Sequence, residues 1–141
     1  MSAQNPASPW LRLAAAIYDL FPLIALWMLS AGGCLLAFHG EIDVAHPPLA
    51  FQVALRSILV AVSAAYFVIS WSRGGQTIGM RAWRLRVVAD DGGSLPWSRA
   101  LLRIAVAMAS AGVGCAWCLF DREKRGLHDI AARSRVDRLA R

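Results

Sequence analysis

The chain has 141 residues, 57% of them hydrophobic, and its formal net charge at pH 7 is +6. This length is enough for one domain, and three cysteines are too few for a disulfide framework. The basic balance does not indicate a nucleic-acid partner, because the charges gather between long apolar runs. Between Leu13 and Ser72 the only Lys or Arg is Arg56. The composition therefore predicts a membrane protein with basic loops.

The first apolar run covers about residues 10–38 and has no charge from Leu20 to Phe38. A helix needs roughly 20 mostly apolar residues to cross a bilayer, so this run predicts a spanning helix. A cleaved signal peptide explains it less well, because the start lacks a basic cluster and Asp19 would lie inside the apolar stretch. Arg12 and Asp19 are close to two helical turns apart, so they share one face of the predicted helix.

A second run covers residues 49–71 and predicts another spanning helix, with aromatic residues near both ends. Its charged residue is Arg56, which can extend toward the outer surface or toward Asp19. The loop 39–48 has no Lys or Arg, whereas the connection 72–98 is basic. Because basic loops stay in the cytoplasm, we predict the connection and the N-terminus inside and the 39–48 loop outside.

Within the connection, residues 83–87 alternate apolar and basic side chains, which is typical of a half-buried strand. Asp90-Asp91-Gly92-Gly93 follows and predicts a tight turn. Together they predict a small amphipathic hairpin at the cytoplasmic membrane surface, with basic residues facing anionic lipid. These lipid-facing residues are Arg81, Arg84 and Arg86.

The third apolar run covers residues 104–120 and has basic residues on both sides. As a helix it would reach about 25 Å, short of the roughly 30 Å hydrocarbon core. It either spans the membrane or is re-entrant, with a turn near Gly112-Val113-Gly114. In the basic tail 121–141, Ile130-Ala131-Ala132 predicts a short interfacial helix. The fold class predicted from these elements is an all-α integral membrane protein, with residues 1–141 as one domain.

The sequence contains no arrangement of residues that indicates catalysis, so we expect no enzymatic activity, no cofactor and no metal site. Cys115 and Cys118 form a CxxC, but they lie in an apolar run, where two small packing residues are expected. Asp19 needs an explanation, because an acid within an apolar helix is paired, protonated or turned toward a cavity. It either holds helices together or serves a proton or cation relay.

Several short motifs, in order over roughly residues 10–136, resemble the RDD family of membrane proteins, which is named for one arginine and two aspartates. The opening is similar in Arg12-Leu13-Ala14 with Asp19, and the closing motif in Leu127-His128-Asp129-Ile130-Ala131-Ala132. The central connection is similar in Gly75-Gln76-Thr77-Ile78-Gly79, in Leu85-Arg86-Val87-Val88 and in Arg99 to Arg103. The chain departs from the family at Arg133-Ser134, where Gly-Thr is usual, and at Met80, where lysine is usual.

The resemblance implies a bacterial inner-membrane protein without a settled activity, in a family where cation or proton transport has been suspected. Arg12, Asp19 and Asp129 all fall in or near the inner half of the membrane, and we hypothesise that they form one polar cluster. Secondary candidates are Arg56, Gln76, Thr77 and His128.

Two functions are compatible with these features. A transport-related protein would have to be a homo-oligomer, because two or three helices cannot enclose a large pathway. A non-catalytic membrane adaptor would bind anionic lipid or an unknown partner protein through its basic inner face.

Overall fold

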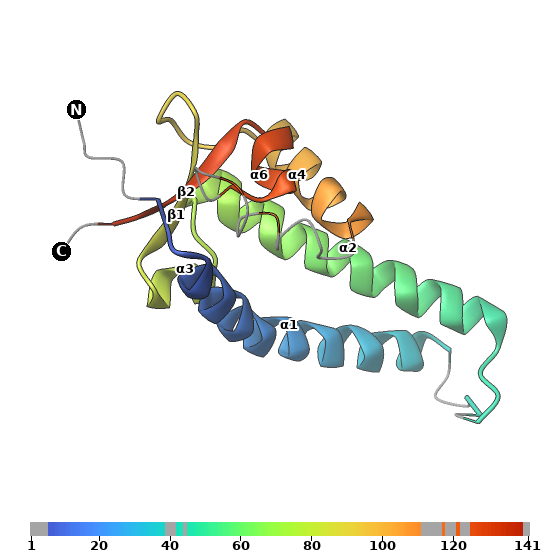
Figure 1. Cartoon of the computed structure of the whole chain (residues 1–141). Coiled ribbons are helices and arrows are strands. Elements are labelled where there is room, and N and C mark those ends of the chain that lie inside the picture. The colour runs from blue at the N-terminus through green and yellow to red at the C-terminus, as the bar shows by residue number, and fades with distance from the viewer. Residues whose placement is uncertain are drawn as a thin grey trace. The chain divides into compact units, whose positions relative to one another are not determined.

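The computed structural model describes residues 6–38, 42–43, 45–110, 117, 121 and 125–139. The elements in chain order are α1 (Pro9–Ala37), α2 (Leu49–Arg73), α3 (Ile78–Ala82), β1 (Leu85–Ala89), α4 (Trp97–Ala109), α6 (Leu127–Ala131) and β2 (Ser134–Arg138) (Figure 1). The chain divides into two compact units. Unit 1 contains Met1–Asp19 and Phe67–Arg141, and unit 2 contains Leu20–Tyr66.

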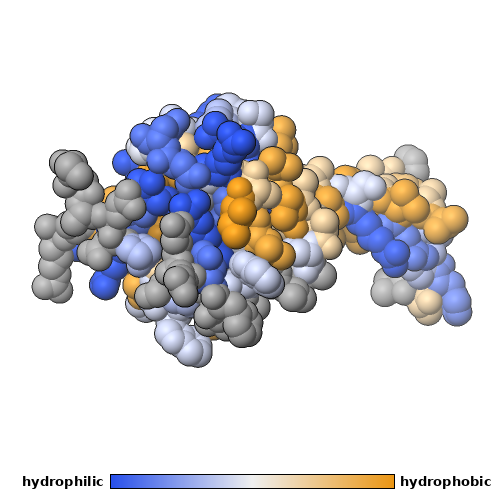
Figure 2. Space-filling model, turned by 45° about the horizontal axis from the view of Figure 1, so that its top comes forward, coloured by the Kyte–Doolittle hydropathy of each residue, from blue (hydrophilic) through white to orange (hydrophobic). Residues whose placement is uncertain are grey.

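Helices α1 and α2 are long enough and apolar enough to cross a membrane, as the sequence predicts. Only a small share of either apolar stretch is buried within the structure, unlike the core helix of a soluble protein. Figure 2 shows apolar side chains at the surface of the molecule. The exposed large apolar residues of these two helices include Phe21, Met28, Leu29, Leu36, Leu49 and Val53.

Unit 2 contains the apolar middle of both helices and the loop between them. Two polar side chains of its helices, Trp27 and Ser63, bond within the unit, as a low-dielectric surrounding favours. Trp27 Nε1 donates a hydrogen bond to Ser63 Oγ at 2.8 Å, and Ser63 Oγ donates to the Leu59 carbonyl at 2.7 Å. Near the loop, the rings of Phe38 and Phe51 pack edge to face with centroids 5.4 Å apart.

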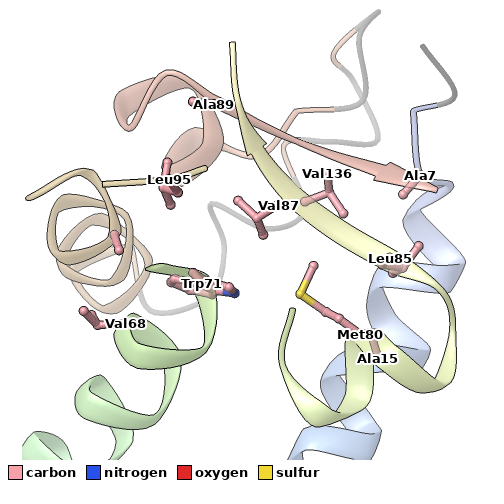
Figure 3. Packing of buried hydrophobic residues seen from close by; sticks show 11 residues of the cluster. Ala7, Ala15, Val68, Trp71, Met80, Leu85, Val87, Ala89, Leu95 and Val136 are labelled. Carbon is pink, nitrogen blue, oxygen red and sulfur yellow. The ribbon is translucent and has the colours of Figure 1, made fainter. Parts of the chain in front are cut away.

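Unit 1 has a hydrophobic core built on the strands β1 and β2. Alternate residues of β1 are buried, which is the period-two pattern of a strand with one covered face. The core residues come from the two strands, from α1, α2, α3 and α4, and from the segments before α1 and α4 (Figure 3). They include Leu85, Val87 and Ala89 of β1, Val136 of β2, Val68 and Trp71 of α2, Ala15 of α1 and Met80 of α3.

The sheet corrects the predicted local hairpin. The strand and the turn after it are present, and Gly92 N donates to the Ala89 carbonyl at 2.8 Å. However, β1 pairs antiparallel with β2 from the tail, not with the residues after the turn. The tail forms the short helix α6 and then this strand. The described residues are therefore mostly helical with one two-stranded sheet, and the all-α prediction is wrong in that respect.

Helix α4 begins at Trp97, inside the predicted polar connection, and ends at Ala109. The helix therefore starts earlier than the predicted third run, 104–120. Residues 111–116 and 118–120 lie outside the described residues. Whether this run spans or is re-entrant, and whether Cys115 and Cys118 are packing residues, stay predictions.

Two segments of unit 1 have the same design. The first segment is α3 with β1, and the second is α6 with β2. In each segment a five-residue helix is followed, one residue later, by a residue with positive φ, and the strand begins directly after that residue. These residues are Arg84 and Arg133, with φ of 54° and 46°. In the sheet, Val87 lies opposite Val136, the residue at the same place in the second segment. The two helix–strand segments are thus related by an approximate two-fold axis through this pair.

Candidate functional site

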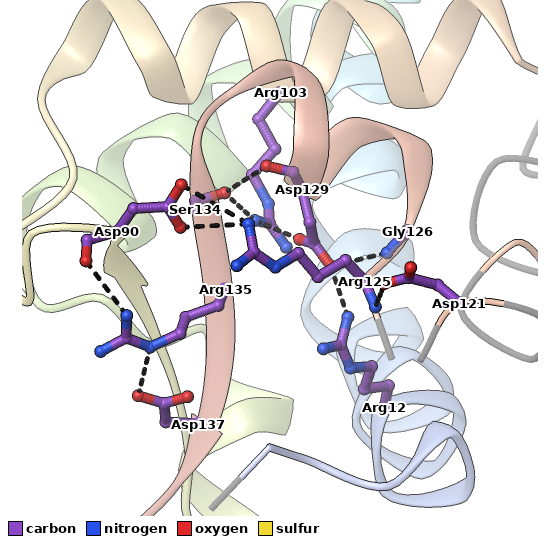
Figure 4. Close-up of polar contacts among 10 residues, drawn as sticks. All are labelled: Arg12, Asp90, Arg103, Asp121, Arg125, Gly126, Asp129, Ser134, Arg135 and Asp137. Carbon is purple, nitrogen blue, oxygen red and sulfur yellow. Dashed lines mark hydrogen bonds and ion pairs between the residues drawn. The ribbon is translucent and has the colours of Figure 1, made fainter. Parts of the chain in front are cut away.

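Asp129 in α6 is completely buried and lies between two arginines from other helices (Figure 4). Its Oδ2 accepts hydrogen bonds from Arg12 Nη1 at 2.5 Å and from the backbone N of Gly126 at 3.0 Å. Its Oδ1 lies 2.5 Å from Nη1 of Arg103 and 3.4 Å from Nε2 of His128. We call this group the Asp129 network. Its members are Arg12, Arg103, His128, Asp129 and Ser134.

Arg103 brings a second positive charge into the interior of unit 1, and only 3% of the residue is exposed. Its Nη1 donates to Ser134 Oγ at 2.7 Å, and its guanidinium carbon lies 4.8 Å from the centre of the Trp71 ring. A guanidinium at this distance over an aromatic face is attracted by the ring. These contacts connect α4 to α2 and β2, while Asp129 connects α4 to α1 and α6.

The network keeps Asp129 ionised. Burial alone would raise the pKa of Asp129, but Arg103, His128 and Arg12 act against burial and lower this pKa to about 2. Burial, together with Arg103 and Arg12, lowers the pKa of His128 to about 4, so His128 is neutral near pH 7. The two arginines therefore carry the stabilisation at neutral pH. Asp129 therefore carries a negative charge near pH 7.

Asp19 in α1 belongs to a second group of contacts, which we call the Asp19 cap: Asp19, Thr77 and Gly79. Asp19 Oδ2 accepts from Thr77 Oγ1 at 2.6 Å, and Oδ1 accepts from the backbone N of Gly79 at 2.8 Å. Thr77 is the N-cap residue of α3, and its Oγ1 accepts from the backbone N of Met80 at 3.1 Å. The first N–H groups of a helix have no partner inside it and favour a nearby carboxylate. Asp19 thus attaches α3 to α1.

Gly79 allows α3 to approach α1 closely. A Cβ at this position would lie 2.0 Å from the Ala15 carbonyl oxygen and 2.9 Å from Asp19 Cγ. The backbones of α3 and α1 are therefore in direct contact, and a side chain larger than hydrogen does not fit between them.

The structure places the predicted cluster in these two groups. Arg12 and Asp129 are in direct contact although they lie near opposite ends of the sequence. The oxygens of Asp19 accept hydrogen bonds from Thr77 and Gly79. Of the three residues predicted to form one cluster, Arg12 and Asp129 belong to the Asp129 network, and Asp19 belongs to the Asp19 cap.

The secondary candidates take different places. Thr77 and His128 belong to the two groups just described, and Gln76 Nε2 donates to the Leu85 carbonyl at 2.7 Å. Arg56 is exposed on α2 in unit 2, and its approach to Asp19 stays a prediction. The three predicted lipid-facing arginines, Arg81, Arg84 and Arg86, are exposed.

Sequence reasoning missed Arg103 and Gly79 as site residues. Helical spacing offered a signal for Arg103, because Trp97, Leu101 and Met108 share one face of α4 and Arg103 lies on the opposite side. Gly79 offered no such signal, since its role depends on the approach of the distant helix α1.

The contacts of these two groups lie within unit 1. In the part of the chain that the structure describes, no three His, Cys, Asp or Glu side chains gather to hold a metal ion. The oxygens of both aspartates contact donors from unit 1 itself.

The fold and the site define a small membrane protein with two candidate spans and a compact unit stabilised by buried charges. The family model of the RDD family matches residues 6–133, and the chain belongs to this family. The match spans both units and contains Arg12, Asp19 and Asp129, so the resemblance inferred from the motifs is confirmed. Comparisons with curated proteins and with solved structures found no match.

Proposed function

We propose that the chain is a non-catalytic membrane adaptor. Its two apolar helices hold it in the bilayer, and exposed arginines of unit 1 bind an acidic segment of a partner protein. One observation carries the proposal: both oxygens of Asp19 and both oxygens of Asp129 contact groups within unit 1. The buried charges therefore support the fold, and the exposed charges remain for recognition.

Four arginines lie in the two strands or directly before them, and we call them the basic face: Arg84, Arg86 and Arg133, which are exposed, and Arg135, which is partly buried. Arg84 and Arg133 occupy equivalent positions in the two helix–strand segments, as do Arg86 and Arg135, whereas the strand partner of Arg86 is Asp137. Arg135 Nε donates to Asp137 Oδ2 at 3.0 Å, so one acid on this side already has an arginine partner. Positive charge exceeds negative charge on the basic face.

Arg84 and Arg133 support a role for the side chains themselves. Both residues have left-handed backbone conformations, which cost roughly 1–2 kcal/mol for a residue with a Cβ. Glycine would adopt these conformations without that cost. Arginine at both equivalent positions therefore supports a use of the charged side chain in binding.

An acidic protein segment fits the basic face better than a membrane surface does. The inner side of the sheet packs on the ends of α1 and α2, so the basic face is on the side away from these helix ends. Because the 72–98 connection is basic, we assign this face to the cytoplasmic side of a bacterial inner membrane, with the N-terminus inside. There, carboxylates of a partner would form charge-assisted hydrogen bonds with the guanidinium groups.

The test replaces Arg84 and Arg133 together with glycine. The double variant Arg84→Gly/Arg133→Gly should fold at least as well as the wild type, because the strain is removed. With the protein in zwitterionic nanodiscs and a polyglutamate peptide as the probe, we expect the affinity to fall by about tenfold, close to 1.4 kcal/mol. The measurement is a fluorescence titration at two salt concentrations.

The control removes two arginines elsewhere in unit 1, Arg73→Gln/Arg99→Gln, and should change the affinity much less. Equal losses in the two double variants would mean that only net charge matters and would refute a defined basic face. Binding to vesicles of anionic lipid without binding of the peptide would assign the face to lipid and contradict the protein partner.

A second function, transport of protons or cations by a homo-oligomer, is favoured by the position of Asp19. This carboxylate is only 3% exposed and lies within an apolar helix, where acids are often functional. Under transport, Asp19 would be on the pathway and would have to exchange its partners Thr77 and Gly79 for an ion.

A further inference from the structure

Helix α4 has its apolar side outward. Arg103 is 3% exposed and Ala100 is fully buried, whereas Trp97 and Leu101 are 50% and 54% exposed. A helix on the surface of a soluble domain has the opposite arrangement, with apolar residues toward the core and charges toward water. The exposed residues of α4 form one face, which is apolar except for Ser98: Trp97, Leu101, Leu102, Ala105, Met108 and Ala109.

The chemistry of this face matches the acyl chains of lipid. None of its side chains is charged, and the nearby Arg103 is turned inward to Asp129 at 2.5 Å. In water, a continuous face of large apolar residues would be unfavourable. Beside lipid, an arginine is costly unless it is paired within the protein, and the Asp129 network supplies that pairing.

Helix α1 is also expected to bring part of unit 1 into contact with lipid. Leu13 and Ile17 of α1 are about half exposed, and this helix continues as the first candidate span. The apolar face of α4 adds to the exposed apolar surface of unit 1.

The length of α4 distinguishes a helix that spans the membrane from one that lies at its interface. Its 13 residues span about 20 Å, less than the roughly 30 Å of the hydrocarbon core. A short helix with one apolar face and a tryptophan at its beginning suits the interface, where such a helix lies with its apolar face at the acyl boundary.

We propose that α4 is an interfacial helix whose exposed face contacts lipid acyl chains. The third membrane-contacting segment then begins at Trp97 and not at Ile104, and Asp129 keeps Arg103 out of the lipid. This proposal is independent of the adaptor function, because it concerns a different face of unit 1.

The experiment measures the accessibility of spin labels in the full chain in nanodiscs. Cys34, Cys115 and Cys118 are first replaced by alanine, and single labels are placed with Leu101→Cys or Met108→Cys. The control label is Arg86→Cys on the basic face. Both native positions on α4 are about half exposed, so the labels should disturb the packing of unit 1 little.

We expect oxygen, which is concentrated in lipid, to relax both α4 labels more strongly than a water-soluble nickel complex. The Arg86→Cys label should show the reverse. Stronger relaxation by nickel at Leu101→Cys and Met108→Cys would place the face in water and overturn the proposal. Low accessibility to both reagents, with spin–spin broadening that disappears on dilution with unlabelled protein, would show that a second copy covers the face and would also overturn it.

Discussion

Replacement of Asp129 by alanine is expected to lower the free energy of unfolding by about 3–5 kcal/mol. Asp129 is fully buried and is shared by Arg12 and Arg103. Without its carboxylate, two guanidinium groups would face each other in the interior with no negative charge between them. Removal of one partner from a buried ion pair is costly for this reason, even where the intact pair contributes little net stability.

The measurement is thermal or dodecyl-sulfate unfolding in mild detergent, followed by far-UV circular dichroism. The matched control is Asp137→Ala, because Asp137 also pairs with an arginine, Arg135, but both side chains are partly exposed. We expect that control to cost less than about 1 kcal/mol. If Asp137→Ala destabilised the protein as much as Asp129→Ala, the Asp129 network would not be the main electrostatic support of unit 1.

Gly79→Ala is the second substitution with a large expected effect, about 3 kcal/mol or more. The new Cβ would lie 2.0 Å from the Ala15 carbonyl oxygen, a backbone atom that cannot move without shifting α1. Relief of this clash moves α3 away from α1 and breaks the hydrogen bonds of Asp19 with Thr77 and Gly79. The same unfolding measurement detects the loss.

Gly33→Ala provides the comparison, because Gly33 is also within a helix and has nothing within 4 Å of the added methyl group. We expect this variant to be as stable as the wild type or up to about 1 kcal/mol more stable, since alanine is the better helix former. Wild-type stability for Gly79→Ala would contradict the close packing of α3 on α1.

The two long helices could be predicted from the sequence because burial in lipid is a local property of composition. Nothing outside residues 10–38 or 49–71 is needed to recognise a stretch that is apolar over the width of a bilayer. The β1 strand was also recognisable, since its alternation of apolar and basic residues is local.

The partner of β1 could not be predicted in the same way. Strand pairing depends on residues far apart in the sequence. The pattern of the tail indicates a helix up to Ala132 and gives no sign that a strand follows it. Arg133 with positive φ ends that helix and starts β2, but arginine gives no sign of a left-handed conformation. The second half of the two-fold arrangement was therefore hidden.

The sequence indicated which residues belong to the candidate site better than it indicated which of them contact one another. Arg12 and Asp19 were indicated by their place in the first apolar run and Asp129 by the family motif, and a common membrane depth motivated the hypothesis that the three meet. The separate role of Asp19 depends on α3, a five-residue helix whose N-terminus meets α1 only in the folded chain. Too few residues form α3 for a periodic pattern to indicate it.

The most direct test of a structural role for the buried charges is the flux of protons and sodium ions in liposomes. Wild type and Asp19→Asn are compared at matched reconstitution, with insertion and folding of both checked by circular dichroism. If the chain is an adaptor and Asp19 only holds α3 on α1, wild-type liposomes should show no more flux than empty liposomes. Flux in the wild type that disappears in a correctly folded Asp19→Asn variant would contradict the adaptor proposal and would place Asp19 on a transport pathway.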